Sequence, residues 1–179
     1  VFAQDARKPI RIGLFVSGFP TEYAGHDQGL LAGLRSYGYV EGKNLIVERR
    51  YAQLQRERLA NSAQELARMN LNAVVTVCTF STKAALSAMR TTPIVMLSVS
   101  DPVGLGLAAS LPRPGKNVTG RSSLSRELIP KMMELFREAL PTVDPIAVLV
   151  NTHNPTHEPL WEDALRAAQR LNLTLVRVA

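Results

Sequence analysis

Short apolar runs alternate along the first two thirds of the chain with longer stretches whose apolar residues recur at helical spacing. Runs of the first kind, bounded by turn residues, predict strands, and the longer repeat predicts helices. The predicted strands span 10–16, 45–49, 73–78, 93–97 and 117–120, and the predicted helices span 21–37, 56–69 and 79–89. This alternation is typical of an α/β fold with an open, doubly wound parallel sheet.

Finer features of the pattern distinguish these elements. The continuous, mainly β-branched run at 73–78 is typical of a central parallel strand covered on both faces, whereas 45–49 alternates and should be less buried. Cys78, the single cysteine, ends the first of these runs, where we expect a small core residue. Thr21 is the expected N-cap of the first helix, and a short helix is expected around 107–110.

After a helix at 126–140 the pattern begins again, with strands at 145–150 and 173–178 around a helix at 159–171. Pro130 lacks a backbone donor, so we expect it in the first turn of its helix or at its start. We therefore predict two domains, 9–122 and 123–179. Two strands are fewer than the ~4 to 6 of a typical sheet, so either the chain continues beyond Ala179 or another copy supplies the missing strands.

Composition excludes some classes of protein. The chain has 179 residues and a formal net charge of +6, and no apolar run approaches the length of a membrane helix. Its basic residues are spread along the sequence instead of clustering with aromatic residues, which argues against a nucleic-acid partner. Val1-Phe2-Ala3 before Gln4 has the small-residue spacing of a signal-peptide cleavage site.

Small polar residues follow three of the predicted strands, at 17–20, 79–82 and 98–101. The loops after parallel strands converge on one edge of the sheet, which is where ligands of α/β proteins bind. Thr79, Ser81 and Thr82 stand at a helix start, where free backbone N–H groups and the helix dipole favour a carboxylate. They either hold such a group or merely cap the helix.

The same loops contain further candidates, each with an ordinary alternative. Asp101 either receives a ligand's ammonium group or caps the turn before Pro102. Phe19 and Tyr23 are candidates for an apolar or stacking wall for a ligand, although Tyr23 could equally be an ordinary core residue of the helix. Ser17 and Ser100 complete the set of candidates at this edge.

Catalytic and metal motifs are weak. The sequence contains no Gly-x-Ser-x-Gly elbow, no Walker loop and no Gly-x-Gly-x-x-Gly after the first strand. His153 and His157, beside Glu158, would suit a metal only on a continuous helix, which Pro155 interrupts. We therefore expect no enzyme activity, no cofactor and no metal.

The most specific signal lies between the fourth and fifth predicted strands. It consists of Asp101-Pro102-Val103, Gly104-Leu105-Gly106, Ser110-Leu111, Arg113-Pro114-Gly115 and Asn117-Val118-Thr119-Gly120. These segments resemble the signature of one group of substrate-binding proteins of ABC-type importers, which includes receptors for tryptophan and other aromatic amino acids. The segments 38–44 and 147–151 and the pair Asn154-Pro155 are also similar to that family, whereas Lys116 stands where it usually has a second glycine.

The resemblance implies a type-I periplasmic binding fold with a complete first lobe and a partial second lobe. It implies a small-molecule solute, such as an aromatic or other amino acid, enclosed between the lobes, and it adds Ser122, Asn151 and Asn154 to the candidate ligand-binding residues. It also implies export to the periplasm or another extracytoplasmic space. The expected protein partners are the permease subunits of the transporter, through which alone the chain would meet a membrane.

Two other functions use the same fold, because fold does not determine function. One is a nucleotide- or sugar-using enzyme domain, against which the missing glycine-rich phosphate loop argues. The other is the effector domain of a transcriptional regulator. That reading needs a helix-turn-helix ahead of Ile10, where nine residues stand.

Overall fold

The computed structural model describes residues 8–123, 125–152, 154 and 156–179. It divides into two compact units between Ser122 and Ser123, called the first and the second unit below. Val1-Phe2-Ala3, with its resemblance to a cleavage site, and His153 and Pro155 of the weak metal motif lie outside the described residues.

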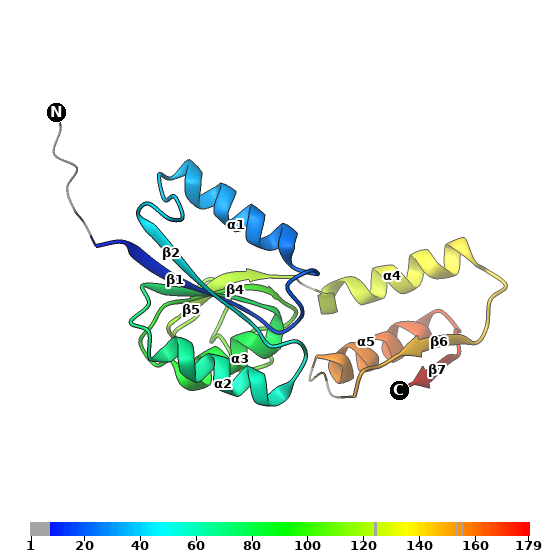
Figure 1. The fold of residues 1–179 in the computed structure, drawn as a ribbon. Helices are drawn as coiled ribbons and strands as arrows, with labels where there is room; N and C mark the ends of the chain where they lie inside the picture. Colours follow the sequence, from blue (N-terminus) through cyan, green and yellow to red (C-terminus); the bar gives the residue numbers. More distant parts are fainter. Residues whose placement is uncertain (1–7, 124, 153, 155) are drawn as a thin grey trace. The chain divides into compact units, whose positions relative to one another are not determined.

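The first unit contains a five-stranded parallel sheet (Figure 1). The strand order β2-β1-β3-β4-β5 changes direction between β1 and β3, which confirms the expected doubly wound architecture. The strands are β1 (Ile10–Val16), β2 (Leu45–Tyr51), β3 (Ala73–Val77), β4 (Ile94–Val99) and β5 (Val118–Ser122). Three helices alternate with them: α1 (Ala24–Ser36), α2 (Arg56–Ala67) and α3 (Cys78–Ala88).

Helices cover both faces of this sheet because successive side chains of a strand point to opposite sides. Phe15 and Val74 are fully buried in the cluster that also includes residues of α2 and α3. Leu14, Val16 and Val77 belong to a second cluster, on which the apolar residues of α1 pack. Figure 1 shows the result, with α1 on one side of the sheet and α2 and α3 on the other. β2 is less buried than β1, as the sequence predicted.

Ion pairs link α1 to β2, the strand at the edge of the sheet. None of the residues of α1 is fully buried, so these pairs add to the apolar contacts that hold the helix. Arg49 of β2 donates from Nε to Asp27 Oδ2 in α1 at 2.9 Å. Its two terminal nitrogens donate to the carboxylate of Glu41 at 2.6 and 2.9 Å. The hydrogen bonds from Arg49 lower the pKa of Glu41 below its ordinary value. One guanidinium therefore ties the helix, the strand and the intervening turn together.

Four expectations need correction in detail. Cys78 does not end a strand: it is the first residue of α3 and is only partly buried. The short helix expected at 107–110 is absent, and the chain makes hydrogen-bonded turns at 102–106 instead. Tyr23, not Thr21, occupies the N-cap of α1. Pro130 lies inside its helix, beyond the first turn, where the helix continues with one backbone donor fewer.

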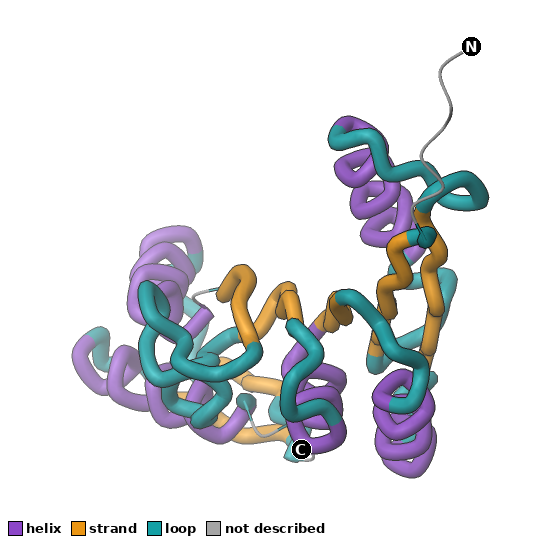
Figure 2. Tube along the Cα trace, turned by 90° about the vertical axis from the view of Figure 1, so that its left-hand side faces the viewer, coloured by secondary structure: helices purple, strands orange, loops and turns teal. Residues whose placement is uncertain are grey.

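The second unit contains α4 (Ser125–Ala139), β6 (Ile146–Leu149), α5 (His157–Arg170) and β7 (Leu175–Val178). β6 and β7 form a parallel pair, and loops join each strand to its helix (Figure 2). Arg126 of α4 donates from Nε to Asp163 of α5 at 2.7 Å, and this bond lowers the pKa of Asp163.

Apolar surface remains exposed on the described part of the second unit. The Leu149 side chain, at the end of β6, is 78% exposed. Two strands and two helices cannot enclose each other on every side. The exposed apolar residues of this unit include Leu128, Met132, Leu135, Leu149, Val176 and Val178.

A glycine in β5 offers a test of the sheet. Gly120 has a φ of 137° and pairs with Met96 of β4, and a Cβ on it would stand 2.0 Å from the Met96 carbonyl oxygen. Because that atom belongs to the ladder, Gly120→Ala should lower the free energy of unfolding by about 2 kcal/mol or more in urea denaturation followed by circular dichroism.

The matched control is Gly33→Ala in α1, where a Cβ would meet no atom within 4 Å. It should raise the free energy of unfolding by about 0.5 to 1 kcal/mol, because alanine favours a helix. Equal changes in the two variants would contradict the close approach between β4 and β5.

Candidate functional site: the carboxyl edge of the first sheet

The carboxyl ends of β1, β3 and β4 lie side by side. Val16 pairs with Val77 in β1–β3, and Val77 pairs with Leu97 in β3–β4, all in parallel. The loops that follow therefore leave the sheet at one edge, called the carboxyl edge below. The strand order changes direction between β1 and β3, so the topology favours a ligand crevice at this point.

A contact between Tyr23 and Cys78 joins two of these loops directly. The Tyr23 hydroxyl and Cys78 Sγ lie 3.3 Å apart in a hydrogen bond, between the residue before α1 and the first residue of α3. This hydrogen bond is the main reason that the pKa of the Tyr23 hydroxyl lies well above its ordinary value, and burial is the second reason. The Tyr23 ring also faces His26, with ring centroids 5.3 Å apart. Tyr23 is thus held in place by the protein itself.

Cys78 adopts a backbone conformation that is unusual for a residue with a side chain. Its φ is 74°, between a buried strand and a helix that follows without any linker. Left-handed backbone costs an L-residue roughly 1–2 kcal/mol, and such strain concentrates at functional sites. The positive φ of Cys78 was not predicted from the sequence. The only sign of it there is that the strand pattern passes directly into the helix pattern at this residue.

The hydroxyl groups of the first turn of α3 divide into two kinds. Ser81 and Thr82 are fully buried, and both bond to the backbone: Ser81 to Val77 O and Cys78 O, and Thr82 to Cys78 O at 2.9 Å. Since Thr82 donates there, its 2.8 Å contact with Thr76 Oγ1 makes Thr76 the donor. These hydroxyls hold the helix against the sheet. Thr79 is buried too, but it takes no part in that internal network.

The end of β4 is irregular. Its pairing with β5 shifts register between Met96 and Val99, and Ser98 has a φ of 56°. The irregularity is followed by Ser100, whose Oγ is buried and has no hydrogen-bond partner among the described residues. Buried polar groups almost always have partners, and one that lacks them at a strand end is a candidate for binding a ligand.

Asp101 is used, at least in part, by its own loop. Its Oδ1 accepts a hydrogen bond from the Gly104 N–H at 2.8 Å, which is the capping role considered from the sequence. A Cβ at position 104 would stand 2.2 Å from Asp101 Oδ2, so a larger residue there would displace this carboxylate. Ser122 likewise donates to Val99 O at 3.0 Å and ties the ends of β4 and β5 together.

The loop after β1 supplies apolar surface. Ser17 is buried, whereas Phe19 is 39% exposed. The Phe19 N–H donates to Glu22 Oε2 at 3.1 Å, which fixes the loop without consuming the ring. The exposed ring therefore stands at the carboxyl edge as a surface on which a flat or apolar group can pack.

Two candidates, Asn151 and Asn154, belong to the second unit. The Asn151 N–H donates to His157 Nδ1 at 3.0 Å, and Asn154 Oδ1 accepts from both the N–H and the hydroxyl of Thr156. Both residues thus shape the loop between β6 and α5. The structure places the nine other predicted residues in the first unit, at or beside the carboxyl edge.

Within the part of the chain that the structure describes, no group of three His, Cys, Asp or Glu side chains could hold a metal ion. Nor is any described helix both long and apolar enough to cross a bilayer.

Comparisons with known proteins identify the family. Residues 10–179 match the family described as "ABC transporter substrate binding protein". The chain belongs to this family. A curated relative, the tyrosine-binding protein of Clostridioides difficile, is 32% identical over 125 residues, which are 70% of this chain and 36% of that protein.

Solved structures agree in fold. A conserved domain protein from Vibrio cholerae is 34% identical, with a TM-score of 0.89 over 96% of this chain and 57% of that one. The ABC domain from Streptococcus pneumoniae in complex with L-Trp has a TM-score of 0.84 at 22% identity, with the same coverage. The chain thus spans little more than half the length of these structures and about a third of the curated relative. It carries the type-I periplasmic binding fold.

Glycine and alanine in place of Cys78 will test its backbone strain. In an ordinary helical turn, alanine is more stable than glycine by about 0.5 to 1 kcal/mol. At a φ of 74° the order should reverse, with Cys78→Gly about 1 kcal/mol more stable than Cys78→Ala in urea unfolding. Both variants lose the Tyr23 contact, so that loss cancels in the comparison.

Ala84→Gly, in the middle of α3, is the control and should lower stability by about 1 kcal/mol. If Cys78→Ala proved the more stable of the two Cys78 variants, residue 78 would not be strained.

Proposed function

We propose that the chain is the solute-capturing part of an ABC import system and that it binds an amino acid, with aromatic ones favoured, at the carboxyl edge. Ser100 carries this proposal, because its buried hydroxyl has no partner among the described residues and follows β4, the neighbour of the strand β3 at which the order changes direction. The named specificities of relatives, tyrosine in one and L-Trp in another, support the choice of ligand.

The chemistry of the edge suits part of an amino acid. α3 begins at Cys78, so the first backbone N–H groups of this helix have no partner within it and can donate to a carboxylate. Thr79 stands in that turn, and the exposed Phe19 ring offers a packing surface for an aromatic side chain. The Gly104 N–H bond to Asp101 Oδ1 leaves the negative charge of this carboxylate in place, so Asp101 stays the candidate counter-charge for an ammonium group.

A second lobe would complete the site. Closing two lobes around a ligand is an established way for binding proteins to capture solutes. Asn151 and Asn154, in the loop after β6, are the positions of the second unit that the family resemblance assigns to the ligand. If a complete site bound its ligand with a Kd of about 1 μM, a lobe supplying half of that free energy would bind at only about 1 mM. The protein would perform no chemistry. It would deliver its solute to permease subunits from the periplasm or another extracytoplasmic space.

A serine substitution separates ligand binding from stability. Ser100→Ala removes a buried hydroxyl that has no hydrogen-bond partner in the described part of the chain, so the free energy of unfolding should stay unchanged or rise. In a chain extended by a complete second lobe, it should weaken the binding of L-Trp or L-Tyr about tenfold by calorimetry, equivalent to one lost hydrogen bond. The unextended chain should bind these ligands far more weakly.

Ser36→Ala is the control, since its hydroxyl donates to Gly33 O on the exposed side of α1, and it should leave affinity unchanged. Equal affinity of the short and the extended chain would overturn the two-lobe mechanism. Binding of nucleotides or sugars in place of amino acids would favour the enzyme reading. The likeness to a LacI transcriptional regulator from Lactobacillus brevis, 14% identical with a TM-score of 0.60, concerns the fold alone.

A further inference from the structure

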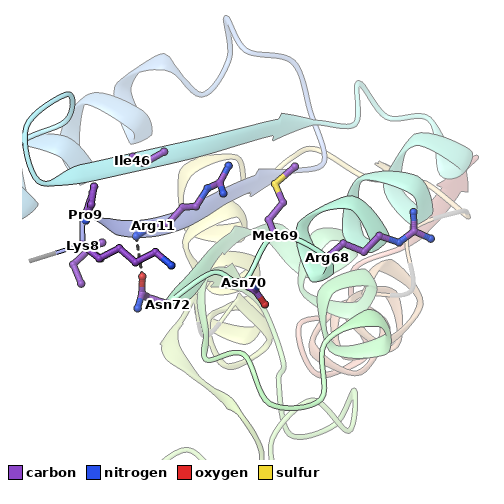
Figure 3. A pocket seen from close by; sticks show the side chains of 9 residues that line it. Lys8, Pro9, Arg11, Ile46, Arg68, Met69, Asn70 and Asn72 are labelled. Carbon is purple, nitrogen blue, oxygen red and sulfur yellow. Dashed lines mark hydrogen bonds between the residues drawn. The ribbon is translucent and has the colours of Figure 1, made fainter.

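The opposite, amino edge of the first unit's sheet carries a hollow of its own. It has a volume of about 430 Å³ and lies between the start of β1, Ile46 of β2 and the turn that leads from α2 into β3 (Figure 3). Its polar lining comes from Lys8, Arg11, Arg68, Asn70 and Asn72. None of these residues belongs to the carboxyl edge, so the hollow has no part in the proposed capture of the solute.

The hollow has a surplus of positive charge. Three of its lining residues are cations, and no carboxylate lines it. Arg11 is compensated by Glu48, whose Oε1 accepts from Arg11 Nε at 3.1 Å and from its Nη2 at 2.6 Å. Lys8 and Arg68 form no ion pair with a described residue. Arg68 follows the last turn of α2, but a helix C-terminus offsets only about half a unit charge.

Hydrogen-bond donors with free capacity lie within this positive region. The side chain of Asn72 is fixed because its Oδ1 accepts the Arg11 backbone N–H at 2.8 Å, and its NH₂ group remains available. Glu48 occupies Nε and Nη2 of Arg11, which leaves Nη1 as a donor. Figure 3 shows the side chains of Lys8 and Asn72 together at one end of the hollow, the Arg11 guanidinium extending away from them, and Arg68 at the other end.

We propose that this hollow is a binding site for a phosphate group, held by the Lys8 ammonium and the Asn72 amide and attracted by the charge of Arg68. The ammonium and the amide NH₂ donate to separate oxygens of a phosphate monoester or of free phosphate, which carry more negative charge than a carboxylate. The positive charge of Lys8 and Arg68 favours a multiply charged anion. The phosphate could be a free ion or the monoester headgroup of phosphatidic acid, because both present the same chemistry.

Two titrations distinguish these sources. Inorganic phosphate is added to the protein at low salt and followed by calorimetry, and sedimentation measures binding to vesicles of phosphatidic acid with phosphatidylcholine. Saturable binding of phosphate alone identifies a free ion as the ligand, and binding to the vesicles alone identifies the headgroup. Binding of neither probe overturns the proposal.

The double variant Lys8→Gln/Arg68→Gln should weaken binding of the effective probe about tenfold, because it removes both uncompensated charges. The control Lys83→Gln/Arg90→Gln changes net charge equally at two exposed cations of α3 and the turn after it, and should change affinity less than about twofold. Equal losses in the two double variants would show general attraction to a basic protein and overturn the site. Unchanged binding in the first variant would overturn it as well. Circular dichroism melts of both variants confirm that the fold is intact.

Discussion

The parallel pairing of β1 with β3 is the constraint on which the first unit depends. Val16 and Val77 are partners in this ladder, so the loop before α1 and the start of α3 leave the sheet at the same edge. That proximity allows the Tyr23 hydroxyl to reach the Cys78 thiol. It also places β2 on one side of β1 and the three later strands on the other, and so sets where a crevice can open.

Unfavourable local features gather at this same edge. Cys78 and Ser98 both adopt positive φ values, and the buried Ser100 hydroxyl meets no hydrogen-bond partner among the residues that the structure describes. Each of these features costs free energy, and a well-packed sheet with helices on both faces can support that cost. Ser81, Thr82 and Ser122, by contrast, are satisfied by backbone carbonyls and stabilise the edge. Chemically similar residues therefore have different roles a few residues apart.

The two edges of the sheet differ in charge because different side chains reach them. The carboxyl edge presents mainly hydroxyls and an aromatic ring, and the Asp101 carboxylate there is engaged by Gly104. The amino edge presents Lys8, Arg11 and Arg68, of which Arg11 is paired with Glu48. Neutral donors suit a ligand that is exchanged readily, whereas uncompensated cations suit a strongly charged anion. A single sheet can thus offer two chemically distinct surfaces.

The order and type of the elements were determined by the sequence alone, because burial on a sheet or a helix imposes a period that apolar residues must follow. The signature around Asp101 and Gly120 likewise indicated the family. Tertiary structure alone decided which hydroxyls are consumed, that Cys78 begins a helix at a φ of 74°, and that Pro130 lies inside α4. These outcomes depend on which distant atoms lie within about 3 Å, as between Ser122 and Val99, and sequence spacing does not encode such distances.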